Sequence, residues 1–365
     1  MTRAPATLAA ALALVLAACS GTPDGSKDRT SPGPATETTT TTTTAETTTS
    51  TTDQADLTTV TTYPPEYSSP LNGLPAENPD DLDRGAIAVK VDNHPLARPQ
   101  GEIGNADAMI ETIVEGGFTR FIALFHDNES DFIGPIRSLR PTDTALAAGM
   151  GTPIGISGGQ PWIQSIAVSR NVRLVGESRG FFRASGRTAP HNLFADTMSI
   201  RSTAIARGWS NERPTALFEI GVWHIPDDAA SQIEMYWADS NVVRWVWDPE
   251  EKVYSRWLGD TPHEWARRDG TREQITAQVL IIVEGTQYVE RNPAGTGSNV
   301  PAIDTLGSGQ AWVFAVGRVW QGSWQRSAYG EPFTLLDADG TPTVVPTGIP
   351  WISVFPEQRT IEYLE

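Results

Sequence analysis

Cysteine is nearly absent from this sequence, since Cys19 is the only one among 365 residues. The chain therefore cannot form an internal disulfide bond, and a zinc site built from several cysteines is excluded. The five histidines offer no replacement, because no two of them have the i, i+4 spacing that places two metal ligands on one helix face. We accordingly expect no metal ion and no cofactor.

Long apolar runs are missing as well, apart from one short run over residues 6–18. At about 13 residues, this run is shorter than the roughly 20 residues of a membrane-spanning helix. It follows Arg3 and ends in Leu-Ala-Ala directly before Cys19, an order typical of a bacterial lipoprotein signal. We expect a signal peptide over residues 1–18 and lipid attachment at Cys19, on the outer face of the cytoplasmic membrane. An ordinary cleaved signal and an uncleaved anchor are the alternatives.

Lysine is scarce too, with three residues in the chain, and the net charge is −17. This charge argues against nucleic-acid binding and against attraction to an anionic lipid surface. The basic side chains are mostly arginines, and seven of them lie between residues 137 and 187 against two acidic residues. Guanidinium groups bind phosphate and carboxylate in a bidentate manner, so we expect an anionic ligand at this segment.

The composition changes twice along the chain. Residues 19–62 are rich in threonine, serine, proline and glycine and have almost no apolar side chains, so we expect a disordered tether. The tether would hold the folded part in the wall or periplasmic space. The length of the folded part predicts two domains, an α/β domain over residues 63–212 and a β-rich domain over residues 213–365.

Strand and helix signals alternate in the first of these domains. Strands are expected over residues 86–91, 120–125, 153–157 and 172–175, and helices over residues 106–115, 142–148, 161–170 and 197–207. This order predicts an α/β fold with a mainly parallel sheet flanked by helices. Later residues predict an antiparallel β-rich half, with strands near residues 233–237, 243–247, 253, 279–283, 311–316 and 333–336. Residues 337–340 (DADG) predict a hairpin turn.

The strongest candidate site binds an anion. Arg137 and Arg140 lie in a segment stiffened by proline. A strand-to-helix turn follows, where backbone N–H groups favour an anion, and we expect Ser157, Gly158 and Gly159 to bind the ligand there. A later loop adds His191 and Asn192 as expected ligand-binding residues. Further candidates for lining the same pocket are Asp92, Asn93, His94, Arg98, Glu115 and Arg120.

Structural ion pairs are the alternative for the same charged residues. Arg137 and Arg140 would then pair with Asp92, Glu111 or Glu115 inside the fold. Asp92, Asp107 and Glu115 could together bind a divalent cation with phosphate, but a satisfied ion-pair network explains them equally well.

Two other patterns suggest different activities. Residues 155–159 (GISGG) fit the G-x-S-x-G pattern of a serine hydrolase, whose triad would need Asp196 with His191 or His224. Ten of the twelve tryptophans lie at or after Trp223, where they form either a core face or a surface for glycans or proteins. We expect a core role for most of them and exposure for Trp320 and Trp324.

Several segments together resemble the YerB-like lipoproteins, a bacterial family catalogued as a domain of unknown function. The similar segments include VDNHPLARPQ (91–100), VEGGFTRF (114–121), IGPIRSLRP (133–141), ISGGQPW (156–162), RTAPHNL (187–193) and GIPWISVFP (348–356). The resemblance covers nearly all of the folded part. It implies a lipoprotein location and a two-part fold, and no established activity.

These observations favour a cell-envelope lipoprotein that binds an anionic ligand, such as a peptidoglycan fragment or a glycopolymer, in an arginine-lined pocket. An enzyme acting on such a polymer by transfer or hydrolysis is one alternative. A scaffold that binds another envelope protein through the tryptophan-rich half is a second alternative. We expect the protein's partners to be the membrane, through the lipid anchor, and an envelope glycan or an envelope protein, but not nucleic acid.

Overall fold

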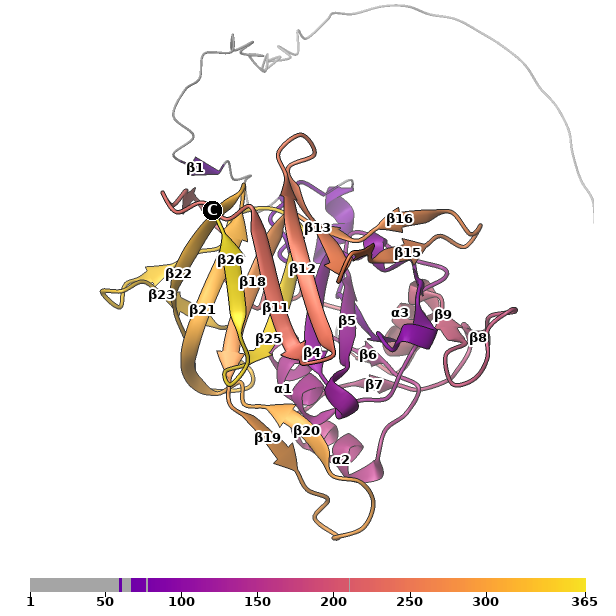
Figure 1. Ribbon diagram of the computed structural model, residues 1–365. Coiled ribbons are helices and arrows are strands. Elements are labelled where there is room, and N and C mark those ends of the chain that lie inside the picture. The colour runs from indigo at the N-terminus through magenta and orange to yellow at the C-terminus, as the bar shows by residue number, and fades with distance from the viewer. Residues whose placement is uncertain (1–58, 61–66, 77, 210) are drawn as a thin grey trace, which may run out of the picture. The chain divides into compact units, whose positions relative to one another are not determined.

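A large mixed sheet connects the two halves of the chain in the computed structural model (Figure 1), which describes residues 59–60, 67–76, 78–209 and 211–365. The signal peptide, Cys19 and most of the tether expected from the sequence lie outside the described residues. Within them, β1 (Thr59–Val60) pairs with β10 (Trp223–His224), so two residues expected in the tether form a strand. No helix of the described segments is long and apolar enough to span a bilayer.

The large sheet has eleven strands. Its order, from one edge to the other, is β24 (Pro342–Thr343), β23 (Thr334–Leu336), β22 (Arg318–Arg326), β21 (Gly307–Ala315), β18 (Val279–Gly285), β25 (Pro350–Pro356), β4 (Ala108–Ile113), β5 (Thr119–Phe125), β2 (Ile87–Asp92), β6 (Ile154–Gly155) and β7 (Leu174–Val175). Strand β25 runs parallel to both β18 and β4, and it thereby joins the late strands to the early ones. The expected division at residue 212 stays a prediction, since strands from both sides of it share this sheet.

The prediction of a mainly parallel sheet in the first half is wrong for its centre. Strands β4, β5 and β2 pair in antiparallel fashion, and only the short strands β6 and β7 continue from β2 in parallel. The expected helix over residues 106–115 is strand β4, which is buried along its whole length. Gly116 and Gly117 form the turn of a β4–β5 hairpin rather than the end of a helix, and the backbone N–H of Val114 donates to the carbonyl of Phe118.

The three α-helices agree with the sequence predictions for their segments. They are α1 (Pro141–Met150), α2 (Pro161–Ser169) and α3 (Thr197–Ala206). Helix α3 begins at Asp196, whose side chain accepts from the backbone N–H of Met198, as expected for an N-cap. Short 3₁₀ turns lie over Pro79–Asp83, Pro95–Ala97, Ile103–Asn105 and Glu115–Gly117.

A six-stranded sheet from the second half packs on the large sheet (Figure 1). Its strands are β11 (Gln232–Ala238), β12 (Asn241–Asp248), β13 (Val253–Leu258), β14 (Thr261–Pro262), β17 (Thr276–Ala277) and β26 (Ile361–Leu364). Aromatic side chains join the two layers, since Trp237 of β11 contacts Phe355 of β25 and Trp245 of β12 contacts Trp351 of β25. The smaller sheets contain β3 (Gln100–Gly101), β15 (Glu264–Ala266), β16 (Arg272–Gln274), β8 (Phe181–Arg183), β9 (Leu193–Ala195), β19 (Gln287–Glu290) and β20 (Val300–Ile303).

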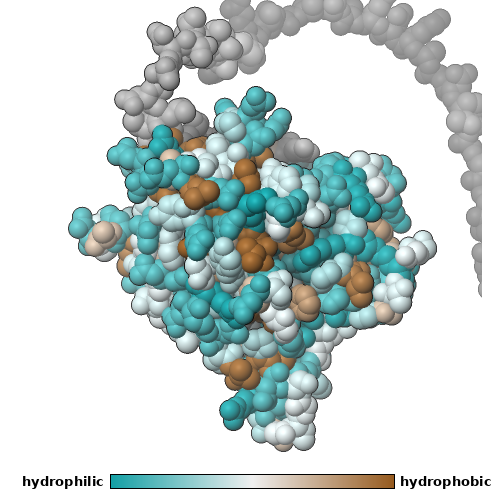
Figure 2. Space-filling model, in the orientation of Figure 1, coloured by the Kyte–Doolittle hydropathy of each residue, from teal (hydrophilic) through white to brown (hydrophobic). Residues whose placement is uncertain are grey.

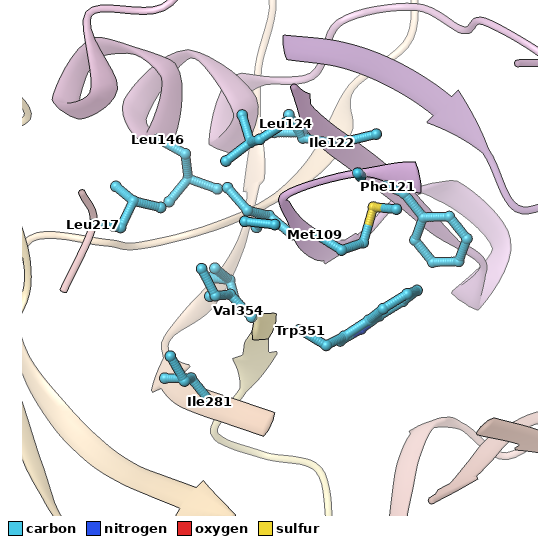
Figure 3. Close-up of a cluster of buried hydrophobic side chains, with 14 of the residues drawn as sticks. Met109, Phe121, Ile122, Leu124, Leu146, Leu217, Ile281, Trp351 and Val354 are labelled. Atoms are coloured by element: carbon cyan, nitrogen blue, oxygen red, sulfur yellow. The ribbon is translucent and has the colours of Figure 1, made fainter. Parts of the chain in front are cut away.

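The core lies on both faces of the large sheet. Figure 3 shows this cluster, with Leu146 of α1 and Leu217 at one end and the rings of Phe121 and Trp351 at the other. Successive residues of a strand point to opposite faces, so Phe121 of β5 meets the six-stranded sheet while Ile122 points to the other side. The face seen in Figure 2 is mostly hydrophilic, with small and separated apolar patches.

The tryptophans of the second half serve mainly the core. Trp324 is 1% exposed, and its Nε1 donates to the carbonyl of Glu284 at 2.7 Å, so the prediction that it is exposed is wrong. Trp320 is half-buried and packs against the core. The DADG turn has the expected conformation, since Gly340 has a φ of 80° and connects β23 to β24.

Candidate functional site

The site is centred on Asp92, the last residue of β2, whose side chain is 3% exposed. Its Oδ2 atom lies 2.7 Å from Nδ1 of His191 and 3.0 Å from Nε of Arg137. Its Oδ1 atom accepts a hydrogen bond from the backbone N–H of His94 at 3.2 Å and lies 4.0 Å from Nε of Arg120. One carboxylate therefore gathers four other predicted site residues from distant parts of the sequence.

The segment around Arg137 is held against β2 by backbone hydrogen bonds. Asp92 N–H donates to the carbonyl of Pro135, and Arg137 N–H donates to the carbonyl of Lys90. On its other side, Ser157 N–H donates to the carbonyl of Arg137 at 3.2 Å. This extended segment therefore lies between β2 and the turn after β6, and it directs the Arg137 side chain to Asp92.

Arg140 is occupied by a second carboxylate. Its Nε and Nη2 atoms lie 2.9 and 2.8 Å from the two carboxylate oxygens of Glu115. Burial opposes ionisation of Glu115, but the hydrogen bond and the charge of Arg140 outweigh it and lower the pKa of Glu115. Arg137 and Arg140 therefore form the ion pairs that the sequence analysis gave as their alternative role.

Arg98 differs from these arginines because its partners are not acidic. Its Nε donates to Oδ1 of Asn93 at 3.0 Å and its Nη2 donates to the carbonyl of Asn93 at 2.9 Å. Among the described residues, no carboxylate forms an ion pair with Arg98. Burial, with a smaller contribution from the charge of Arg256, lowers the pKa of Arg98 to about 10, and at neutral pH the side chain remains a cation.

Arg187 is the second cation of this region without an acidic partner in the described structure. Its Nη1 donates to the carbonyl of Ala97 at 3.0 Å, and its Nη2 donates to the carbonyl of Pro99. These bonds fix the loop after β8 against the residues on either side of Arg98. The guanidinium also lies over the ring of Phe194. Arg187 belongs to the arginine cluster of residues 137–187, but we did not predict it as a site residue.

An open groove of about 530 Å³ joins these groups. The groove is lined by Leu96 and Arg98 and by residues 186–191, with Arg187 and His191 among them. A second pocket of about 420 Å³ also contains Arg98, and it is lined further by Pro99 and residues of the second half, Leu258, Thr261, Pro262, His263, Glu264 and Arg272. Arg98 therefore lies between two neighbouring hollows.

Behind the groove, a buried polar network connects the two halves of the chain. Glu111 of β4 accepts hydrogen bonds from Arg256 at 2.7 Å, from Thr119 at 2.6 Å and from Trp351 at 2.9 Å. Asn93 reaches this network by donating to Oγ1 of Thr119 at 2.7 Å. His263 contacts Arg256 and Gln100, and burial together with the charges of Arg256 and Arg98 lowers the pKa of His263 well below its usual range. The sequence named Glu111 only as an alternative partner and gave no signal for Arg256.

Other predicted residues lie outside the groove. Gly158 accepts a backbone hydrogen bond from Leu139, and Gly159 lies close to the same residue. Asn192 contacts Arg183 and the carbonyl of Arg187. At the N-terminus of α2, the Gln160 side chain donates to the carbonyl of Ser298.

In the described structure, no hydrogen bonds join the candidate hydrolase residues, which are Ser157, Asp196 and His191 or His224, into a triad. Asp196 caps α3, and His191 is bonded to Asp92. Within the described parts of the chain, no side-chain hydrogen bond joins Ser157 to a histidine. His224 lies in β10, which pairs with β1.

The acidic residues considered for a cation are engaged elsewhere. Asp107 accepts from the backbone N–H groups of His126 and Asn128 and from the Asn128 side chain. The described residues contain no group of three or more His, Cys, Asp or Glu side chains arranged to hold a metal ion.

Comparisons with known proteins identify relatives of the whole folded part. The N-terminal and C-terminal domain models of the family described as "Protein of unknown function (DUF3048)" match residues 71–210 and 233–352. The Bacillus subtilis (strain 168) protein named "Putative lipoprotein YerB" is 27% identical over 301 residues, which are 80% of this chain and 87% of that protein. A crystal structure of YerB protein from Bacillus subtilis has a similar fold, with a TM-score of 0.68 and 24% identity, covering 81% of this chain and 99% of that one.

Proposed function

The chain belongs to the DUF3048 family, and from this premise we propose that it is an exported, lipid-anchored envelope protein that binds an anionic ligand through Arg98 and Arg187. The relative named as a lipoprotein supports the anchor. The order of Arg3, the apolar run and Leu-Ala-Ala before Cys19 supports the same conclusion from this chain's own residues. The lipid on Cys19 would hold the chain at the outer face of the cytoplasmic membrane, with its ligand in the wall or periplasmic space.

The main support for the binding proposal is that Arg98 and Arg187 line one groove and that neither has a direct acidic partner in the described structure. Arg137 and Arg140 each have a carboxylate within 3.0 Å, whereas Arg98 and Arg187 bond to an amide and to carbonyl oxygens. Neither guanidinium of the groove is therefore paired directly with a carboxylate in the described structure, although Glu111 and Asp92 act on the charge of Arg98 from a distance, and both can bind an anionic ligand. A guanidinium presents several N–H donors in a plane, and this geometry suits phosphate and carboxylate oxygens.

The kind of ligand follows from the charge and shape of the groove. The chain as a whole carries a net charge of −17, so an anion is attracted by this local feature rather than by the protein in general. The groove is open, and a second hollow shares Arg98 with it, an arrangement that suits a segment of an extended polymer. An envelope glycopolymer or peptidoglycan fragment bearing phosphate or carboxylate groups is the ligand class that we propose.

Calorimetric titration of the full chain in detergent micelles tests this proposal, with orthophosphate and a glycerol-phosphate oligomer as probes. A hydrogen bond to a charged group contributes about 1.5–3 kcal/mol, so Arg98→Gln or Arg187→Gln should each weaken binding by roughly 10-fold to 100-fold. Arg183→Gln is the matched control, because Arg183 is half exposed and already pairs with Glu177.

Two further variants separate binding from folding. Arg98→Lys and Arg187→Lys keep the charge but lose the planar donor group, so they should weaken binding less than the glutamine variants. Thermal melting of every variant shows whether the fold is retained. Equal affinity of wild type and both glutamine variants, or no binding of either probe to folded wild type, would contradict the proposal.

A further inference from the structure

The orientation of the His191 ring is fixed by a buried carboxylate. Its Nδ1 lies 2.7 Å from Oδ2 of Asp92, and a carboxylate only accepts hydrogen bonds, so Nδ1 carries the proton. Asp92 is itself held by Arg137 and by the backbone N–H of His94. The neutral imidazole therefore has its free electron pair on Nε2.

The Nε2 atom of His191 is available to a ligand. Within the described chain it has no hydrogen-bond partner, and it is not among the buried atoms left without one. His191 lines the same groove as Arg98 and Arg187. A basic nitrogen and two guanidinium groups without a direct acidic partner in the described structure therefore share one open site.

A second imidazole supports the first. The ring of His94 stacks on that of His191, with centroids 4.9 Å apart and planes inclined by 18°. Nδ1 of His94 accepts from the backbone N–H of Leu96 at 3.2 Å, and burial followed by the charge of His191 lowers the pKa of His94. The stacked ring of His94 therefore supports His191 on one face.

We propose that His191 is a catalytic base, aligned by Asp92, for the hydrolysis of a phosphodiester held by Arg98 and Arg187. This inference rests on the proposed anion binding and adds a reaction to it. His191 is the group that would contact the attacking water, whereas Asp92 is a positioning residue. The same pair of groups, an imidazole and an acid that orients it, activates nucleophiles in many enzymes.

The reaction needs only water as a second reactant. A water oxygen bonds to phosphorus while Nε2 of His191 takes one of its protons, and the bond from phosphorus to the leaving oxygen breaks with its electron pair. The proton on Nε2 then passes to the leaving oxygen and restores the neutral ring. Asp92 stabilises the transient imidazolium, and Arg98 and Arg187 stabilise the negative charge on the phosphoryl oxygens.

The charged groups around His191 are consistent with this cycle. Asp92 faces it directly, with Arg137 at 3.0 Å and Arg120 at 4.0 Å from the carboxylate. These two cations compensate part of the Asp92 charge, so the carboxylate orients the ring without being its full counter-ion. Arg98 and Arg187 line the same groove as His191.

Hydrolysis of bis(4-nitrophenyl) phosphate by the full chain in detergent micelles tests the inference. General base catalysis contributes about 10²-fold to 10⁴-fold, so His191→Asn should reduce kcat by that factor. The asparagine amide can still donate to Asp92, so melting and orthophosphate binding should change little. His224→Asn is the matched control, because His224 is an exposed histidine of β10.

Two readouts distinguish a catalytic from a merely structural role. Free imidazole in the buffer should restore part of the activity of His191→Ala, and kcat should fall in His191→Asn while its affinity for orthophosphate stays close to that of the wild type. Orthophosphate binding without turnover in the wild type would overturn the inference and leave the proposed binding intact. Turnover unchanged in His191→Asn would overturn it as well, whereas absence of both binding and turnover would overturn both proposals.

Discussion

Glu111 is the residue whose loss should affect the fold most, because it links the two halves of the chain through a buried charge. It lies in β4, is fully buried, and accepts hydrogen bonds from Thr119 of β5, Arg256 of β13 and Trp351 of β25. In Glu111→Gln the side chain keeps its shape but loses its charge. Arg256 is 0% exposed and cannot give up its proton, so its charge would remain in the core without a counter-ion.

The size of the effect follows from the cost of a buried unpaired charge. Removal of one partner of a buried ion pair destabilises proteins by about 3–5 kcal/mol. Domains are typically stable by about 5–15 kcal/mol, so Glu111→Gln should remove a large part of the free energy of unfolding. Replacement of both partners, in Glu111→Gln with Arg256→Met, should recover most of that loss because this pair then leaves no unpaired charge in the core.

Urea unfolding at pH 7, followed by tryptophan fluorescence, measures these differences. Glu177→Gln is the matched control, since its partner Arg183 is half exposed, and it should leave the free energy of unfolding nearly unchanged. A loss below about 1 kcal/mol in Glu111→Gln, or a double variant less stable than the single one, would refute the assignment of Glu111 as the counter-ion of a buried charge.

Two further predictions concern stability. Burial lowers the pKa of His126 to about 4, below the value of about 6.5 in an unfolded chain. The unfolded state therefore binds the extra proton first, and stability should fall by about 3 kcal/mol as the pH drops through this interval. Urea titrations between pH 7 and pH 4 should show a shallower slope in His126→Gln than in the wild type, where His263 adds to the fall, and the same slope in both proteins would contradict this prediction. Trp324→Phe leaves the carbonyl of Glu284 without its donor and should cost about 1–3 kcal/mol by the same assay, whereas an equal loss in Trp320→Phe, at a half-buried position, would speak against this cause.

Secondary structure was predicted correctly from the sequence where the local residue pattern matches the burial of the element in the fold. The apolar run over residues 120–125 became the buried strand β5, and Asp196 begins α3 as its capping chemistry predicts. The helix expected over residues 106–115 failed because Met109, Ile110 and Ile113 fit a helical face as well as a strand buried on both sides. Only the pairing of this segment with β5 and β25 decides between them, and the residues of β25 lie more than 200 positions away.

The site was predictable in its residue types but not in its partners. Asp92, His94, Arg137 and His191 were all nominated, and the structure gathers them around one carboxylate. No sequence spacing shows that Asp92 meets a histidine 99 positions later or that Arg140 meets Glu115. Within the described structure, those pairings leave Arg98 and Arg187 as the guanidinium groups of the groove without a direct acidic partner.

The most direct test of the anion site is a crystal structure of the chain with a glycerol-phosphate oligomer bound. We expect a phosphoryl group in the groove between Arg98 and Arg187, within hydrogen-bond distance of both guanidinium groups. We also expect the ion pairs of Arg137 with Asp92 and of Arg140 with Glu115 to remain intact in that complex. A phosphoryl group bound instead by Arg140 at the turn of Gly158, with the groove unchanged, would contradict the account.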